Sequence, residues 1–264
     1  MVRTDPRAVA TLEAHLAYVR FLTEAGGGGV VDGGGIVIYR STTPLPFLVN
    51  GAARTDPSVP PEGVVDAVRG HFGPRGFEIL CLEGRDDDLG AAAENAGLRI
   101  GSPDPLQYLD RPPRPGPADR SALEVRPVTD ASGVRDLAEV CEDAHFAYGS
   151  LFPKGTFQGI LGEPAVLAPA IDAVVVYEHG APVATAQVFA HGELAYVGWV
   201  AVARTAMRRG FGWLTTEEVV TRSFERGAKS AVLLASPMGA PLYRQLGFVD
   251  VGNLKNAYSR GVAG

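Results

Sequence analysis

Two arginines and two glycines stand between an apolar, strand-like segment and a helix-like segment. Residues 197–213 read VGWVAVARTAMRRGFGW, and Arg208 and Arg209 directly precede the Gly-x-Gly motif of Gly210 and Gly212. The first N–H groups of a helix have no partners within that helix, and glycines let an anion approach the backbone. The segment therefore predicts a cradle for a phosphate or diphosphate group.

Gly-x-Gly alone is equally compatible with an ordinary helix-start turn that carries solvated arginines. The dinucleotide-binding fingerprint requires a third glycine, but Thr215 stands at that position. A Walker loop requires Gly-Lys followed by Ser or Thr, and this sequence is absent here. The glycine-rich segment 26–35 lacks both a strand before it and a helix pattern after it, so we interpret it as a flexible connection into a strand.

A second motif follows the loop later in the chain, and the spacing between the two motifs matters for the interpretation. After the strand-like SAVLLAS comes a short helix-like segment that contains LYRQLGF, residues 242–248. Together the motifs resemble the GNAT superfamily of acyl-CoA-dependent N-acetyltransferases. Its signature is a strand that reaches a valine, then [Q/R]-x-x-G-x-[G/A] opening a long helix, and later a short helix with lY..lGF. Here Val202 ends the strand, and the resemblance covers about residues 123–260.

The sequence departs from the family pattern at two positions. Met207 stands where Gln or Arg is usual, and Arg204 stands where many relatives have Pro. The backbone donors of the loop survive both changes, so the positive charge must come from Arg208 or Arg209.

The resemblance implies that acetyl-CoA is the cosubstrate and that its acetyl group passes directly to an amine, without a covalent enzyme intermediate. The acceptor would be an amine of a small molecule or a peptide. Backbone groups at the end of the long strand would bind the pantetheine arm, and one N–H would polarise the thioester carbonyl. By this resemblance the cofactor-binding residues are Val200, Ala201, Val202, Met207, Arg208, Arg209, Gly210, Phe211, Gly212, Trp213 and Ser236.

Tyr243 is the candidate general acid for the leaving thiolate. A tyrosine has a pKa of ~10, close to that of an alkyl thiol, so the proton transfer is nearly balanced. The alternative is that Tyr243 is a half-buried aromatic residue on an amphipathic helix.

The attacking amine must lose a proton, and Glu193, at the start of the long strand, is the favoured base. Glu142, Asp143 and His145 lie on the first helix of the second half, which borders the acceptor site in this superfamily, and remain alternatives. His191 is a further alternative. Two other chemistries have little support: Cys141 lies on an apolar helix stripe with no adjacent basic partner, and the histidines lack metal-ligand spacing.

The two halves of the chain resemble each other. IVIYR (36–40) matches VVVYE (174–178), and Ala96-Gly97-Leu98 matches Leu246-Gly247-Phe248 at an offset of about 150 residues. The first half lacks the Arg-Arg-Gly-Phe-Gly loop. We therefore expect an α/β (α+β) chain of two tandem GNAT-like domains, each a mixed, mostly antiparallel central sheet flanked by helices. The predicted divisions are a degenerate domain (1–112), a linker (113–122) and the acetyltransferase domain (123–264).

Apolar periodicity and turn residues predict the individual elements. The predicted helices span about 5–19, 61–72, 89–97, 129–148, 212–227 and 239–247. The predicted strands include 36–40, a segment near 46–53, 77–83, 122–128, two strands around the turn at 179–181, 194–202, 230–236 and two more in the tail.

Composition limits the partners of the protein. The chain has 264 residues and a net charge of −6, which argues against nucleic acid or an anionic membrane as the main partner. The two cysteines, Cys81 and Cys141, lie in apolar patterns typical of buried free thiols. No apolar run approaches the ~20 residues of a membrane span. We expect a cytoplasmic monomer or homodimer, and a non-catalytic acyl-CoA sensor or partner-binding module remains the alternative function.

Overall fold

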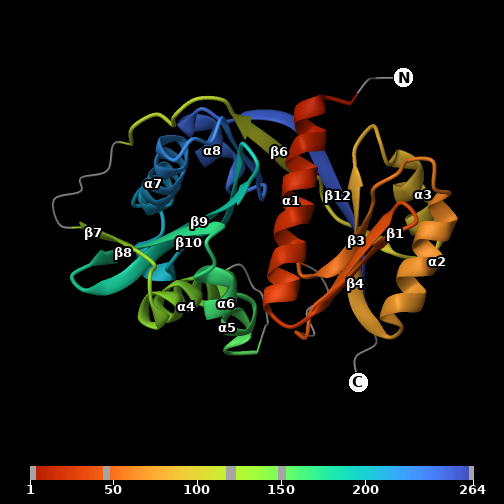
Figure 1. The fold of residues 1–264 in the computed structure, drawn as a ribbon, viewed down its shortest axis with the longest axis horizontal. Coiled ribbons are helices and arrows are strands. Elements are labelled where there is room, and N and C mark those ends of the chain that lie inside the picture. The colour runs from red at the N-terminus through yellow and green to blue at the C-terminus, as the bar shows by residue number, and fades with distance from the viewer. Residues whose placement is uncertain (1–3, 44–47, 117–122, 148–152, 262–264) are drawn as a thin grey trace. The chain divides into compact units, whose positions relative to one another are not determined.

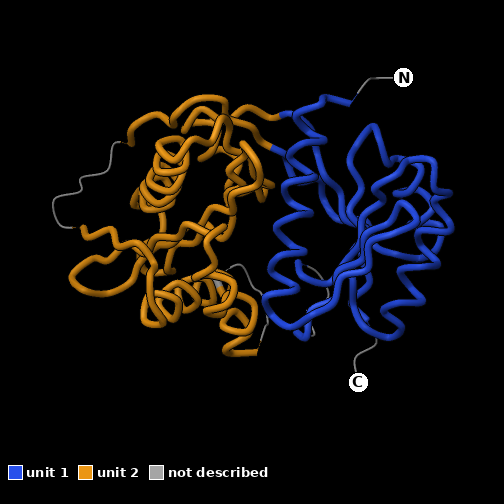
Figure 2. Tube along the Cα trace, viewed as in Figure 1, with its two compact units in different colours: residues 1–106, 251–264 blue, residues 107–250 orange. Residues whose placement is uncertain are grey.

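The computed structural model of the chain describes residues 4–43, 48–116, 123–147 and 153–261. The chain divides into two compact units (Figure 2). Unit 1 contains residues 1–106 and 251–264, and unit 2 contains residues 107–250.

Unit 1 is built on strands in the order β1-β2-β3-β4-β12. Strands β3 and β4 pair in parallel, whereas the β1–β2, β2–β3 and β4–β12 pairs are antiparallel. Its elements are α1 (Pro6–Ala25), β1 (Gly29–Gly33), β2 (Ile36–Arg40), β3 (Asn50–Arg54), α2 (Pro61–Phe72), β4 (Arg75–Leu82), α3 (Asp87–Asn95), β5 (Arg99–Ile100) and β12 (Val249–Gly261).

Helices cover both faces of the unit 1 sheet. Figure 1 shows α1 on one face and α2 with α3 on the other. The carboxylate of Asp5 accepts the N–H of Arg7 and caps α1, which begins at Pro6 as the sequence predicts. On the other face Val64 and Val68 of α2 pack against Ile79 of β4 in the buried core. The amphipathic spacing of these residues explains why α2 forms on this face.

The strands of unit 2 follow the order β6-β11-β10-β9-β8-β7. Only the β10–β11 pair is parallel among the pairs from β7 to β11. Its elements are β6 (Asp104–Leu109), which begins in unit 1, β7 (Leu123–Pro127), α4 (Ala131–Ala147), α5 (Thr156–Ile160), α6 (Glu163–Val166), β8 (Ile171–Glu178), β9 (Ala181–His191), β10 (Leu194–Val202), the 3₁₀ turn η1 (Arg204–Ala206), α7 (Phe211–Glu225), β11 (Ser230–Leu234) and α8 (Ala240–Leu246).

The long strands β8, β9 and β10 lie between α7 on one face and α4 on the other (Figure 1). On the α7 face, Val219 and Val220 of the helix pack with Val174, Ala186 and Val197 of the strands. Each unit is therefore a mixed, mostly antiparallel sheet flanked by helices, which confirms the predicted fold class.

The tail of the chain differs from the prediction. Residues 249–261 form one long strand, β12, rather than two. This strand pairs with β4, in a register that includes Leu254↔Leu82 and Ala257↔Ile79, so residues 251–264 belong to unit 1 and not to the predicted domain 123–264. The division between the units also falls at residues 106 and 107 rather than in the predicted linker, part of which (117–122) lies outside the described residues.

Other local elements agree with their predictions to different degrees. The helix predicted to end at Gly97 forms α3 and ends at Asn95, and Gly97 has the predicted left-handed conformation, with φ +83°, before the chain turns into β5. Strand β6 and the short helices α5 and α6 form from segments without clear apolar periodicity, and they were not predicted from the sequence. By contrast, α2 and α7 begin and end within one or two residues of their predicted bounds.

The two units share part of their order of elements. In unit 1, two antiparallel strands (β2, β3) lead through α2 to the parallel strand β4 and then to α3. In unit 2, β9 and β10 lead through α7 to β11 and then to α8 in the same way. In this shared order β2 takes the position of β9. The segment IVIYR of β2, however, matches VVVYE of β8 in sequence, so the sequence match and the order of elements differ by one strand.

No helix in the part of the chain that the structure describes is long and apolar enough to cross a membrane. Cys81 and Cys141 are both buried and unbridged, as the sequence predicts.

Candidate functional site

Strands β10 and β11 separate part of the way along their length. Their parallel register runs through Leu194↔Ser230 and Ala195↔Ala231 and ends at Tyr196↔Val232. Strand β10 continues to Val202 and stays paired with β9 on its other side. The peptide groups of β10 beyond Tyr196 have therefore left the ladder with β11, and we call this place, where the two strands are no longer paired, the opening.

A β-bulge distorts β10 at the point where this opening begins. The register with β9 shifts between Gly198 and Ala201. Within the bulge Trp199 has φ +50°, a left-handed conformation that a bulky residue rarely adopts. A bulge bends its strand and re-aims the neighbouring peptide groups. Here the groups that change direction belong to Val200 and its neighbours, which are among the residues predicted to bind the pantetheine arm.

The loop after β10 presents a row of backbone N–H groups at the start of α7. Gly210 has φ +87° and occupies the N-cap position, where a residue with a side chain would be strained. Within the described chain, the backbone N–H groups of residues 208–213 donate no hydrogen bond. Together with the positive end of the dipole of α7, they form a site with the chemistry of an anion cradle.

Some side chains of the loop pack against the protein and do not face a ligand site. Phe211 is buried in a hydrophobic cluster with Leu214, and Trp213 packs closely on Gly116. Gly212 faces Leu242 of α8, where an added Cβ would lie 3.2 Å from its Cδ2 atom. Phe211, Gly212 and Trp213 therefore contribute backbone N–H groups, and the side chains of Phe211 and Trp213 serve packing.

The two arginines of the loop have different surroundings. The Arg209 guanidinium donates to both carboxylate oxygens of Glu178, at 2.8 and 2.5 Å, and lies over the ring of Phe211. Arg208 is exposed, has φ +60° and forms no ion pair with the described residues. Of the two, Arg208 is therefore the one whose positive charge is available at the anion cradle. Met207, beside it, is half-buried with an extended backbone.

Tyr243 lies on α8, which contacts α7. Its side chain is 9% exposed and meets the ring of Phe248 edge-on at 6.0 Å between centroids. The absence of a side chain at Gly239 leaves room for the ring, since an added Cβ there would lie 3.0 Å from the Tyr243 Cε2 atom. Ser236 is exposed, and its Oγ accepts the N–H of Gly239 just before α8.

Tyr196 is a residue of the opening that the sequence did not single out. It is the last residue of β10 paired with β11, and it is buried. Burial raises its pKa, the N–H of Leu234 donates a hydrogen bond that opposes this rise, and the nearby Tyr243 adds to it. Two tyrosines from β10 and α8 thus lie close together at the closed end of the opening. The available signal was a tyrosine within an otherwise apolar strand.

Comparisons with known proteins support this geometry. Residues 137–248 match the model of the acetyltransferase (GNAT) family. This segment of the chain therefore has the sequence pattern of the GNAT family. The match contains α7, α8 and the opening between β10 and β11, so the predicted recognition is confirmed for this part of the chain. No sequence among the curated proteins matches the chain.

Solved structures share the fold of the GNAT segment and of the remainder of the chain. A GCN5-related N-acetyltransferase from Kribbella flavida is 21% identical, covers 94% of this chain and 96% of its own, and has a TM-score of 0.71. A GCN5-related N-acetyltransferase from Sphaerobacter thermophilus is 16% identical, covers 97% and 94%, and has a TM-score of 0.62. At these identities the likeness establishes the fold alone.

The predicted base Glu193 lies away from the opening in the GNAT domain. It is exposed in the turn before β10, where its carbonyl accepts the N–H of Lys229. From Glu193 to the bulge at Trp199 the strand rises roughly 20 Å, at about 3.3 Å per residue. The structure therefore does not bring Glu193 together with the loop or with Tyr243. His191 is exposed at the same end of the strand.

Three alternative bases lie on α4, on the other face of the GNAT sheet. Both carboxylate oxygens of Glu142 accept the N–H of Gly155, at 3.0 and 2.8 Å. Asp143 accepts the backbone N–H and the Nε–H of Arg204, each at 2.7 Å. His145 packs beside Trp199, with 6.0 Å between ring centroids. Only His145 of the three directs its side chain at the bulge. Residues 148–152, which follow α4, lie outside the described residues.

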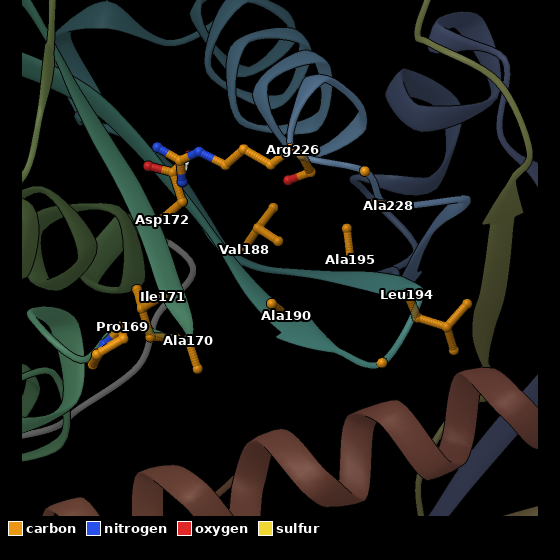
Figure 3. A pocket seen from close by; sticks show the side chains of 13 residues that line it. Pro169, Ala170, Ile171, Asp172, Val188, Ala190, Leu194, Ala195, Arg226 and Ala228 are labelled. Carbon is orange, nitrogen blue, oxygen red and sulfur yellow. Dashed lines mark ion pairs between the residues drawn. The ribbon is translucent and has the colours of Figure 1, made fainter.

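One cavity in this domain lies apart from the opening. A cavity with a volume of about 200 Å³ lies near the end of α7. Figure 3 shows the side chains that line it, among them Asp172, which forms an ion pair with Arg226, and the small apolar side chains of Val188 and Ala195. Leu194, at the start of β10, also lines this cavity. The cavity therefore lies at the opposite end of β10 from the anion cradle.

Among the described residues, no group of three or more His, Cys, Asp or Glu side chains could hold a metal ion.

Proposed function

We propose that the protein is an N-acetyltransferase that transfers an acetyl group from acetyl-CoA to an amine of a small molecule or a peptide by direct attack. One observation carries the proposal. The backbone N–H groups of residues 208–213 have no acceptor in the described chain, and they stand where β10 has left β11. A diphosphate would supply the missing acceptors, and a thioester arm would fill the opening.

Each part of the opening has a role in this reaction. The peptide groups of Val200, Ala201 and Val202 bind the pantetheine arm, and one N–H polarises the thioester carbonyl as an oxyanion donor. Arg208 adds positive charge beside the diphosphate. Tyr243 donates a proton to the departing thiolate. The acidic net charge of −6 fits neither a nucleic acid nor a membrane as partner, and we expect a monomer or a homodimer.

The test measures acetyl-CoA binding by calorimetry and thiol release from acetyl-CoA with a broad panel of amines. Gly210→Asp places a carboxylate in the anion cradle, and we expect it to weaken acetyl-CoA binding at least a hundredfold. Gly192→Asp is the matched control, because Gly192 also has a positive φ (+60°) but lies in an open turn at the other end of β10. We expect near wild-type affinity from it.

Equal affinities of the wild type and Gly210→Asp would contradict the loop assignment. Acetyl-CoA binding without thiol release for any amine would contradict the enzyme proposal. That result would favour the alternative, a non-catalytic acyl-CoA sensor or partner-binding module. The feature of the sequence that favours this alternative is Met207, which stands where Gln or Arg is usual.

A further inference from the structure

The proposed reaction requires a group that takes a proton from the amine, and α4 faces the reacting end of the opening. Two of its candidates are engaged elsewhere. Glu142 holds the N–H of Gly155, which is the N-cap residue of α5, and thereby fixes the start of that helix. Asp143 holds Arg204 of η1 through two hydrogen bonds. Both carboxylates therefore organise neighbouring segments.

His145 is held against the bulge of β10. Its ring lies 4.4 Å from the ring of Phe157 and 6.0 Å from that of Trp199, centroid to centroid. One helical turn earlier, the Cys141 Sγ lies 4.0 Å from the carbonyl oxygen of Trp199. Two successive turns of α4 thus contact the same bulged residue. Trp199 directly precedes Val200, where the proposed thioester-binding peptide groups begin, so the imidazole borders the reacting end of the arm.

The hydrogen bond of His145 selects its tautomer. Nδ1 lies 2.8 Å from the carbonyl oxygen of Cys141. A carbonyl oxygen only accepts hydrogen bonds, so Nδ1 carries the proton and the lone pair of the neutral ring is on Nε2. An imidazole in this state is prepared to accept a proton at Nε2.

We infer that His145 is the general base of the proposed acetyl transfer and that its Nε2 atom accepts a proton from the acceptor ammonium group. This inference rests on the proposed function. The proton moves from the ammonium nitrogen to Nε2, and the neutral amine then attacks the thioester carbonyl carbon. As the C–N bond forms, the C–S bond breaks and the thiolate takes the hydroxyl proton of Tyr243. The nitrogen releases its surplus proton to water, which reprotonates Tyr243, and His145 returns its proton to water.

The surroundings of His145 keep it neutral near pH 7. Burial lowers its pKa, and the bond to the Cys141 carbonyl opposes this only in part. Of the two elements in ring contact with it, α5 has no titratable side chain and β10 has only Tyr196. The nearby charges of Glu142, Asp143 and Arg204 are engaged as described above. The basic form is therefore the resting form, as a general base requires.

The experiment compares the wild type with His145→Gln, and with Glu139→Gln as the matched control. Glu139 is exposed on the same helix and lies outside the proposed site. The best acceptor of the amine panel is used, kcat/KM is measured from pH 5.5 to 9.5, and acetyl-CoA affinity is measured by calorimetry. We expect His145→Gln to lower kcat/KM for the amine roughly 10²-fold at pH 7 with acetyl-CoA affinity changed less than threefold.

The pH profile separates a base from a packing residue. The wild type should show an acid limb set by the histidine, whereas activity of the variant should recover at high pH, because the amine loses its proton to solvent there. His145→Asn provides a second variant if Gln disturbs the helix. Turnover that survives both substitutions at pH 7, or a parallel loss of acetyl-CoA affinity, would overturn the inference alone. A wild type that binds no acetyl-CoA, or that turns over no amine, would overturn the proposed function as well.

Discussion

Arg209 and Glu178 form a two-pronged ion pair across 31 residues of sequence, with N···O distances of 2.8 and 2.5 Å. The pair ties the loop before α7 to the end of β8. The adjacent Arg208 has no such partner among the described residues. Two arginines that look equivalent in the sequence therefore have different surroundings: Arg209 ties the loop to β8, and Arg208 is the one that we propose as the source of positive charge at the anion cradle.

This division predicts unequal effects of neutralising the two arginines. Arg208→Gln should weaken acetyl-CoA binding about tenfold, because it removes a charge-assisted hydrogen bond to phosphate worth about 1.5 kcal/mol. Arg209→Gln should weaken binding less than threefold. Calorimetric titrations at one fixed ionic strength measure both changes. A larger loss with Arg209→Gln would reverse the assignment.

Tyr243→Phe should reduce turnover far more than acetyl-CoA affinity. The substitution keeps the ring that packs on Phe248 but removes the proton that the thiolate needs, so we expect kcat to fall roughly 10²-fold. Acetyl-CoA affinity should change less than threefold. Steady-state kinetics and calorimetry on the same preparation give both numbers. Equal losses in the two would mean that Tyr243 serves packing only.

Much of the fold follows from local signals in the sequence. Helix α2 begins at Pro61 and α7 follows Gly210, and both residue types act through their own backbone geometry. The placement of β12 could not be predicted in this way. Its partner β4 lies far away in sequence, and which strand a segment pairs with depends on the assembled sheet rather than on the segment itself.

The residues of the site also fall into two groups, those predicted from sequence patterns and those identified only from the fold. The loop, its glycines and Tyr243 were predicted because their types and spacing are a contiguous pattern. The base was predicted at Glu193, because the resemblance to the GNAT superfamily implies a carboxylate at the start of the long strand. His145 became the better candidate only once the fold placed it beside Trp199, 54 residues later in the chain, and once Glu142 and Asp143 were seen to bind Gly155 and Arg204.

A buried carboxylate in unit 1 predicts a pH-dependent stability. Glu78 is 6% exposed, and its oxygens accept the N–H of Leu48 at 2.8 Å and the side-chain amide of Asn256 at 3.1 Å. Burial raises its pKa from 4.5 to about 7; the two hydrogen bonds oppose this shift, and the nearby Asp104 adds to it. Between these two pH values the folded state therefore binds more protons at this group than the unfolded state does.

Because of this, the contribution of Glu78 to the free energy of unfolding falls as pH rises from about 4.5 to about 7, by on the order of 3 kcal/mol in total. Glu78→Gln should remove this dependence and raise stability relative to the wild type more at pH 8 than at pH 5. Urea unfolding at the two pH values measures the difference. Glu94→Gln, at an exposed position on α3, is the control. A variant-minus-wild-type difference that is the same at both pH values would contradict the prediction.

The buried ion pair of Arg54 and Asp86 should be essential for the stability of unit 1. Both side chains are almost completely buried, and Arg54 also reaches Asp88, which is 54% exposed. Asp86→Ala leaves the buried Arg54 charge with only one carboxylate partner, Asp88, so we expect a loss of about 3–5 kcal/mol. Asp88→Ala should cost about 1 kcal/mol or less, because its carboxylate is largely solvated. Urea unfolding of the two variants should show this order, and equal losses would refute it.

The most direct test of the account is the structure of the protein crystallised with acetyl-CoA. We predict that the diphosphate oxygens lie about 2.7–3.2 Å from backbone nitrogens between Arg208 and Trp213. The arm should pass between β10 and β11 with its thioester beside Val200. A diphosphate bound elsewhere, or a loop left empty at saturating acetyl-CoA, would contradict the central claim.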